Sequence, residues 1–236
     1  MNQIVAEFIG SSLLIIFGNG VVANVVLNKS KGQNSGWIVI ALGWSMAVFI
    51  AVYCVGQYSG AHLNPAVSLA LAIAGKMPWS ALPAFWAAQL MGCMTGAMVV
   101  WTIYKDHFAQ TTGADDIQAC FCTKPAILNY TQNFITEALS TAIFIFGVMM
   151  LTKAEVGLGS LDALPVALLV LGIGLSLGGP TGYAINPARD LGPRIAHAFL
   201  PIQSKGDNGW SYSWVPVAGP MAGAAAGCFL YQLILQ

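Results

Sequence analysis

Residues 59–67 read SGAHLNPAV and residues 182–194 read GYAINPARDLGPR, so the tripeptide Asn-Pro-Ala occurs twice in the chain. The two copies are Asn64, Pro65, Ala66 and Asn186, Pro187, Ala188. Asn is a preferred N-cap, and Pro is favoured at the first helical position because its missing N–H would have no partner there. We therefore expect a helix to begin at each copy, over residues 64–75 and 186–199, with the Asn amide donors at its tip.

Six apolar runs surround the two motifs. They cover residues 4–27, 37–55, 79–104, 134–152, 163–181 and 214–236 and contain only two charged residues, Glu7 and Glu137. Each run reaches the roughly 18–20 residues that cross a bilayer core of about 30 Å. Only 8% of the chain is charged, against about 25% in a soluble domain. The sequence therefore predicts an all-α membrane protein with six transmembrane helices, and nine cationic side chains are too few for a nucleic-acid interface.

The chain divides into two similar halves joined by a polar segment. We expect residues 1–104 to form the first repeat, residues 105–132 a connecting extracellular loop, and residues 133–236 the second repeat. Each half has a glutamate early in its first span and an Asn-Pro-Ala between its second and third spans. Three spans per half place the second copy on the opposite face of the membrane. This is an inverted repeat, an architecture typical of membrane transport proteins.

The segment that follows the first Asn-Pro-Ala is too short to cross a membrane, because residues 64–75 span only about 18 Å as a helix. We predict re-entrant half-helices, whose irregular backbone must be buried in protein or line a cavity. Inversion lets their N-termini meet near the membrane midplane. The residues before each motif should be extended, with carbonyls that face a wet pore. They are Gly60, Ala61, His62, Leu63, Gly182, Tyr183, Ala184 and Ile185.

The paired motifs resemble the aquaporin family, and the resemblance covers essentially the whole chain. Asp190, Arg194 and the pair at 216–217 are similar to the glycerol-facilitator branch. The resemblance implies an aquaporin-like fold, homotetramers with one pore per subunit, and a bacterial cell membrane with both termini cytoplasmic. The lysine count of the loops alone would place the N-terminus outside. We adopt the orientation of the family, because short loops with few charges make that count a weak signal.

The family's spacing implies a selectivity filter of four residues, Trp44, Gly174, Tyr183 and Arg189. Water channels usually have His where Gly174 stands, so the resemblance implies room for a polyol between two aromatic walls. Glycerol-conducting members often have Phe at the position of Tyr183. The tyrosine hydroxyl is a departure that leaves the range of solutes open.

Glu7 and Glu137 lie inside apolar spans, where ionisable groups are costly and usually functional. One interpretation is a proton relay. The other, which we favour because the spans offer no further ionisable partners, is that both carboxylates accept backbone N–H groups of the re-entrant loops. We give Asp190 a structural role as well. His62 beside the first motif has a gating or proton role as one alternative and packing within its loop as the other.

Together these observations predict a passive channel for glycerol and other small uncharged solutes, and for water, that excludes ions and protons. Other polyols, urea and protonated small acids satisfy the same filter. The alternative is a proton-coupled secondary carrier, which would want paired carboxylates or ion-coordinating side chains near the midplane. We expect no catalytic residues, metal or cofactor, since the chain has neither a nucleophile–base pair nor a metal-ligand motif.

Overall fold

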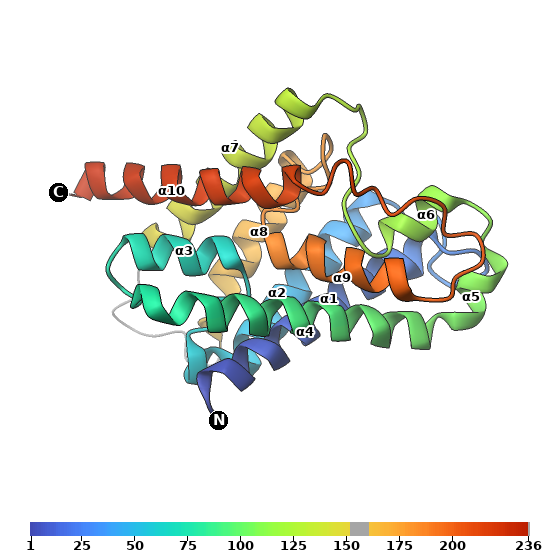
Figure 1. Ribbon diagram of the computed structural model, residues 1–236, viewed down its shortest axis with the longest axis horizontal. Helices are drawn as coiled ribbons and strands as arrows, with labels where there is room; N and C mark the ends of the chain where they lie inside the picture. Colours follow the sequence, from blue (N-terminus) through green and yellow to red (C-terminus); the bar gives the residue numbers. More distant parts are fainter. Residues whose placement is uncertain (152–160, 236) are drawn as a thin grey trace.

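The computed structural model describes residues 1–151 and 161–235, and throughout these two ranges the regular structure is helical (Figure 1). The helices are α1 (Gln3–Val26), α2 (Trp37–Ser59), α3 (Pro65–Ile73), η1 (Trp79–Ala81), α4 (Leu82–Ile103), α5 (Lys105–Gln110), α6 (Ala114–Ala119), α7 (Tyr130–Met150), α8 (Leu164–Ser176), α9 (Pro187–Phe199) and α10 (Val215–Leu235). The fold is therefore the all-α architecture that the apolar runs predict.

Five of these helices are long and apolar enough to cross a membrane: α1, α2, α4 together with η1, α7 and α10. The sixth predicted span, residues 163–181, is helical only over Leu164–Ser176, so that α8 has 13 residues. The run Gly178-Gly179-Pro180 follows after the C-cap residue Leu177, and proline both lacks an N–H and disfavours the α conformation of the residue before it. Residue 152, the predicted end of the fourth span, lies outside the described residues.

The two halves are packed through matching pairs of helices. α1 packs against α4 in the first half, and α7 packs against α10 in the second. Glycines allow this close approach, since a Cβ at Gly96 of α4 would lie 2.6 Å from the carbonyl oxygen of Ser12, and one at Gly227 of α10 would lie 2.5 Å from that of Ala142. Small residues at such interfaces let helix backbones come together.

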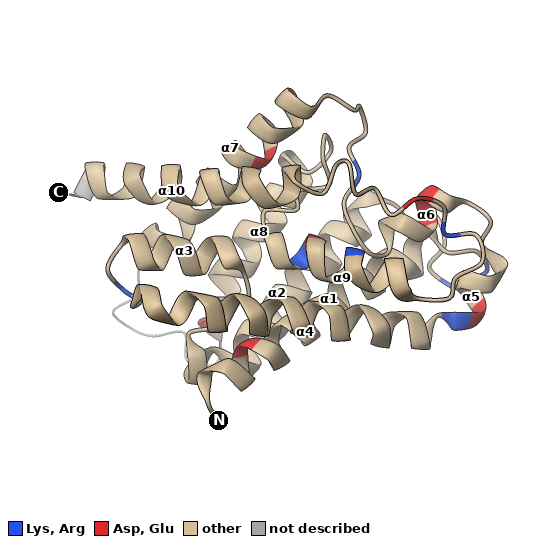
Figure 2. Ribbon diagram, in the orientation of Figure 1, with Lys and Arg blue, Asp and Glu red and all other residues tan. Residues whose placement is uncertain are grey.

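The short helices α3 and α9 connect the two halves. α3 packs against α10, and α9 packs against α4, so that each short helix lies on the last long helix of the other half (Figure 1). Both chain termini lie away from the end of the molecule that carries α5 and α6. Figure 2 shows that many of the charged residues gather at this α5–α6 end, while few are found along the long helices.

Candidate pore

The N-termini of α3 and α9 carry the two Asn-Pro-Ala motifs. Asn64 is the N-cap of α3, and its Oδ1 accepts a hydrogen bond from the N–H of Ala66 at 2.9 Å. Asn186 is the N-cap of α9, and its Oδ1 accepts from the N–H groups of Ala188 and Arg189, both at 3.1 Å. In both cases the proline follows at the first helical position. Capping leaves the Nδ2 of each Asn directed beyond its own helix.

Each of these amide groups reaches the opposite half of the molecule. Nδ2 of Asn64 donates to the carbonyl of Ile185, and Nδ2 of Asn186 donates to the carbonyl of Leu63, both at 2.8 Å. A primary amide has two N–H donors. One donor of each Asn therefore joins the two half-helices end to end, and the other remains for a molecule in the space between them.

The loops that lead into the half-helices share an unusual backbone. Positive φ angles occur four, three and one residues before each Asn. They are 80° at Gly60, 49° at Ala61 and 52° at Leu63, and 80° at Gly182, 37° at Tyr183 and 41° at Ile185. The expectation of extended segments is therefore wrong at these six positions. Left-handed residues other than Gly are costly and persist only where their surroundings impose them.

Two buried carboxylates impose this conformation. Glu7 accepts the N–H groups of His62 (2.9 Å) and Leu63 (2.8 Å), and Glu137 accepts those of Ala184 (3.0 Å) and Ile185 (2.9 Å). In each loop two successive N–H groups turn toward one carboxylate, and such a pair forms a concavity that binds an anion. These are the contacts expected from the second interpretation of Glu7 and Glu137, in which both carboxylates accept backbone N–H groups of the re-entrant loops.

Three further polar residues complete the carboxylate sites, and the sequence analysis missed them. Ser59 donates its hydroxyl to Glu7, and Thr181 donates its hydroxyl to Glu137, both at 2.6 Å. Gln89 on α4 is fully buried and donates to Glu7 at 2.8 Å. The sequence signal for Gln89 was a single Gln within an apolar span, since a buried amide needs hydrogen-bond partners.

The imidazole of His62 packs within its own loop. Its Nδ1 lies 3.0 Å from Oγ of Ser68, and its ring lies 4.9 Å from that of Phe85. His62 also lines the central cavity. Of the two alternatives for this residue, the packing interpretation has these contacts to support it.

A cavity of about 220 Å³ lies against the meeting point of the half-helices. Its polar lining comes from the two pore loops, both motif asparagines and Arg189. The apolar part of its lining comes from Leu14, Trp44, Val48, Val52, Val67, Leu71, Phe144, Val148, Val166 and Val170. The lining of the cavity thus combines hydrogen-bonding groups with a large hydrocarbon surface.

Arg189 and Trp44 form one side of this cavity. Cζ of Arg189 lies 4.3 Å from the centroid of the Trp44 ring, a distance at which a guanidinium is attracted to an aromatic face. No described residue accepts a hydrogen bond from this guanidinium, so its donors remain for a solute. A Cβ at Gly18 of α1 would collide with the Trp44 ring. Gly18, which the sequence analysis missed, therefore makes room for the aromatic wall.

Gly174 packs against the Tyr183 ring. Tyr183 lines the cavity, whereas Gly174 does not. A Cβ at Gly174 would lie 3.0 Å from Cζ and 3.1 Å from Oη of Tyr183. Trp37 closes the other side, edge-on to the Tyr183 ring at 5.8 Å, and donates from Nε1 to the carbonyl of Gly174 at 3.0 Å. The space that glycine leaves at position 174 is thus filled by the Tyr183 ring. The Tyr183 hydroxyl is buried and has no partner among the described residues.

The described cysteines are all free, and the described residues contain no group of three or more His, Cys, Asp or Glu side chains that could hold a metal ion. Cys120 and Cys122 are buried in the segment between α6 and α7. Burial raises the pKa of the Cys122 thiol to about 12, so this thiol is neutral at physiological pH.

Comparison with known proteins assigns this geometry to a family. The sequence model of the major intrinsic protein family matches residues 1–231. The chain belongs to this family. As a major intrinsic protein it is a multi-pass membrane protein, and its curated relatives include bacterial glycerol uptake facilitators.

The relatives match this major intrinsic protein along nearly its whole length. It is 53% identical to a probable glycerol uptake facilitator protein of Thermotoga maritima over 98% of this chain and 99% of the relative. It is 40% identical to a D/L-lactic acid transporter of Lactiplantibacillus plantarum over 95% and 94%. Among solved structures, the aquaglyceroporin of Plasmodium falciparum is similar with a TM-score of 0.87 at 29% identity, over 99% of this chain and 96% of that chain.

Proposed function

We propose that this chain is a passive channel that lets glycerol and other small uncharged solutes, together with water, diffuse across the bacterial cell membrane. The observation that carries the proposal is the cavity at the two capped half-helices, whose lining combines hydrogen-bonding groups with hydrocarbon. Glycerol combines the same two features, a row of hydroxyls and a carbon edge. The glycerol uptake facilitators among the relatives support the choice of glycerol.

Each hydroxyl of a solute exchanges its hydrogen bonds with water for bonds to the wall. Arg189 and the remaining N–H groups of Asn64 and Asn186 act as donors. The acceptors are six loop carbonyls that receive no hydrogen bond from the described residues, those of Gly60, Ala61, His62, Gly182, Tyr183 and Ala184. The carbon edge of the solute lies against Trp44 and Tyr183. We propose that these two residues, Arg189 and Gly174 behind Tyr183 form the selectivity filter.

Ions are excluded because the wall does not replace their hydration shell. Cations and protons are also opposed by Arg189 and by the N-termini of α3 and α9, each equivalent to about half a positive charge. The hydrogen bonds between Asn64, Asn186 and the opposite loops hold the two N-termini at the same place.

We infer the topology from the matching contacts of the two halves. Residues 1–104 and 133–236 are the two inverted repeats, residues 105–132 are an extracellular loop, and both termini are cytoplasmic. The matching positive φ angles and carboxylate contacts support the repeat, and the position of the termini away from α5 and α6 supports a common side. We propose a homotetramer, as the family resemblance implies, and no enzymatic activity.

Within the part of the chain that the structure describes, the two carboxylates of the long helices are not free to act as the proton-binding group of a carrier. Glu7 accepts four hydrogen bonds and Glu137 accepts three, all from within the protein. Protonation of either would break contacts that hold a strained loop. We therefore retain the channel alone.

Stopped-flow swelling of proteoliposomes tests the proposal. Vesicles with the purified protein should take up glycerol faster than empty vesicles, and should also take up urea and protonated lactic acid, while a hexitol is retained outside. Glycerol uptake equal to that of empty vesicles would overturn it. The swelling rates measured with urea and protonated lactic acid also rank these solutes against glycerol.

A further inference from the structure

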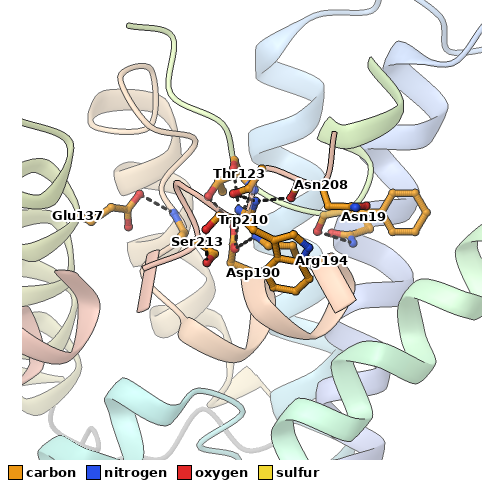
Figure 3. A network of polar contacts seen from close by, with 11 residues as sticks. Asn19, Thr123, Glu137, Asp190, Arg194, Asn208, Trp210 and Ser213 are labelled. Carbon is orange, nitrogen blue, oxygen red and sulfur yellow. Dashed lines mark hydrogen bonds and ion pairs between the residues drawn. The ribbon is translucent and has the colours of Figure 1, made fainter. Parts of the chain in front are cut away.

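A buried ion pair on α9 begins at the residue that follows Arg189. Asp190 and Arg194 are fully buried (Figure 3). Oδ1 of Asp190 accepts a hydrogen bond from Nε of Arg194 at 2.9 Å and forms an ion pair with Nη2 at 2.8 Å. A buried pair tends to be costly unless the remaining donors and acceptors of both groups are satisfied. The partners of those remaining atoms therefore show what the pair is built to hold.

Arg194 satisfies its other donors on two extramembrane segments. Its Nη1 donates to the carbonyls of Asn208 and Gly209, both at 2.8 Å, in the segment between α9 and α10. Its Nη2 donates to the carbonyl of Thr123 at 3.1 Å, in the segment between α6 and α7. The guanidinium thus ties both segments to α9.

Thr123 satisfies the other oxygen of the carboxylate. Oδ2 of Asp190 accepts the backbone N–H of Thr123 at 2.7 Å and its hydroxyl at 2.6 Å. The methyl group of Thr123 lies 3.3 Å from the place where a Cβ of Gly182 would be. Thr123 therefore contacts Asp190, which follows Arg189 in sequence, and Gly182, which precedes Tyr183.

The Asp190–Arg194 ion pair has no counterpart in the first half of the chain. Counted from its Asn, the position of Asp190 corresponds to Ser68 on α3, and that of Arg194 corresponds to Ala72. Ser68 contacts His62 and Gln89 instead. The buried ion pair therefore occurs only on α9, the half-helix that carries Arg189.

We propose that Thr123 is a positioning residue for the filter, and that its hydroxyl, through the Asp190 carboxylate, fixes the pose of Arg189 against Trp44 and so favours glycerol over water. This inference rests on the proposed function. Glycerol must contact Arg189 and the aromatic walls at the same time, whereas water needs a single contact. Loosening the first turn of α9 therefore slows glycerol more than it slows water.

Two variants of Thr123 separate its hydroxyl from its methyl group. Thr123→Val keeps the branched shape and removes the hydroxyl, while Thr123→Ser keeps the hydroxyl and removes the methyl. Thr111→Val is the matched control, because Thr111 is also buried and hydrogen-bonded, to His107 and Asn28, and contacts neither Asp190 nor Gly182. Glycerol and water permeability are measured in the same vesicles at matched protein density.

Thr123→Val should lower the ratio of glycerol to water permeability by about three- to tenfold, the size of effect that loss of one ordinary hydrogen bond produces. Thr123→Ser and Thr111→Val should keep the ratio of the unmodified protein. An unchanged ratio in Thr123→Val, or an equal fall in any two of the three variants, would overturn the inference.

Hydrogen–deuterium exchange of residues 182–189 tests the positioning independently of transport. Exchange in this segment should be faster in Thr123→Val and unchanged in Thr123→Ser and Thr111→Val. If the unmodified protein carries no glycerol, the proposed function fails while this measurement still decides whether Thr123 positions the filter. Equal exchange in all four proteins would contradict the inference even where glycerol is conducted.

Discussion

Asn64 and Asn186 each donate an amide hydrogen to the loop that ends at the other, with the same N···O distance of 2.8 Å. The two residues lie 122 positions apart in sequence and occupy equivalent places in the two halves. Their side chains join the N-termini of α3 and α9 and present one free N–H each at the cavity. The molecule thus concentrates donors and positive helix ends at one point.

Replacing either Asn by Asp should weaken the exclusion of cations. Asn64→Asp or Asn186→Asp removes the donor to the opposite carbonyl and puts a negative charge beside two positive helix ends. Proton and Na⁺ leak into liposomes should rise, as measured with entrapped fluorescent indicators. Asn129→Asp is the control, because Asn129 caps α7 in the same way at the surface. Leak rates of both pore variants equal to that of the control would refute the proposed role of the asparagines.

Adding a methyl group at Gly174 should narrow the filter by displacing the Tyr183 ring toward the cavity. In Gly174→Ala the new Cβ lies against the Tyr183 ring, which must move toward the cavity. Glycerol permeability should fall about tenfold, equivalent to about 1.4 kcal/mol in the barrier, and water permeability should fall less because water is smaller. Gly172→Ala, on the same helix with nothing within 4 Å of its Cβ, should leave both rates unchanged. Equal losses of glycerol and water in Gly174→Ala would mean that Tyr183 does not select by size.

Glu137→Gln should destabilise the protein without changing the size of any side chain. Its amide NH2 would face an N–H donor, so that at least one loop hydrogen bond is lost while Ala184 and Ile185 stay in a strained loop. Each bond to a charged group is worth about 1.5–3 kcal/mol. Thermal unfolding in detergent should therefore begin at a clearly lower temperature. An unchanged transition would show that the carboxylate does not hold the loop.

Lys205 should stabilise α9 from its C-terminal end. Its Nζ donates to the carbonyls of His197, Ala198 and Leu200 at 2.8, 2.8 and 2.9 Å. Cations at this end of a helix contribute about 0.3–1 kcal/mol. Lys205→Met should lower the unfolding temperature and speed hydrogen exchange in residues 196–200. Lys124→Met, which loses only an exposed ion pair with Asp115, is the control, and the account fails if both variants behave alike.

Local sequence signals predicted much of the architecture because they describe local physics. The apolar runs predicted the long helices, and Asn followed by Pro predicted where α3 and α9 begin. The sequence could not predict the positive φ angles at Ala61 and Tyr183, because the carboxylates that impose them come from distant helices. For the same reason the contact between Gly174 and Tyr183, and the role of Thr123, became visible only when the tertiary structure placed these residues together.

Transport of glycerol with and without a proton gradient tests the central claim most directly. In proteoliposomes, the initial rate of glycerol uptake is measured over a wide range of glycerol concentrations, with and without a protonophore. A passive pore predicts a rate that rises in proportion to the glycerol gradient and is the same with and without the protonophore. A rate that saturates with glycerol and collapses when the proton gradient is dissipated would contradict the channel and establish a carrier.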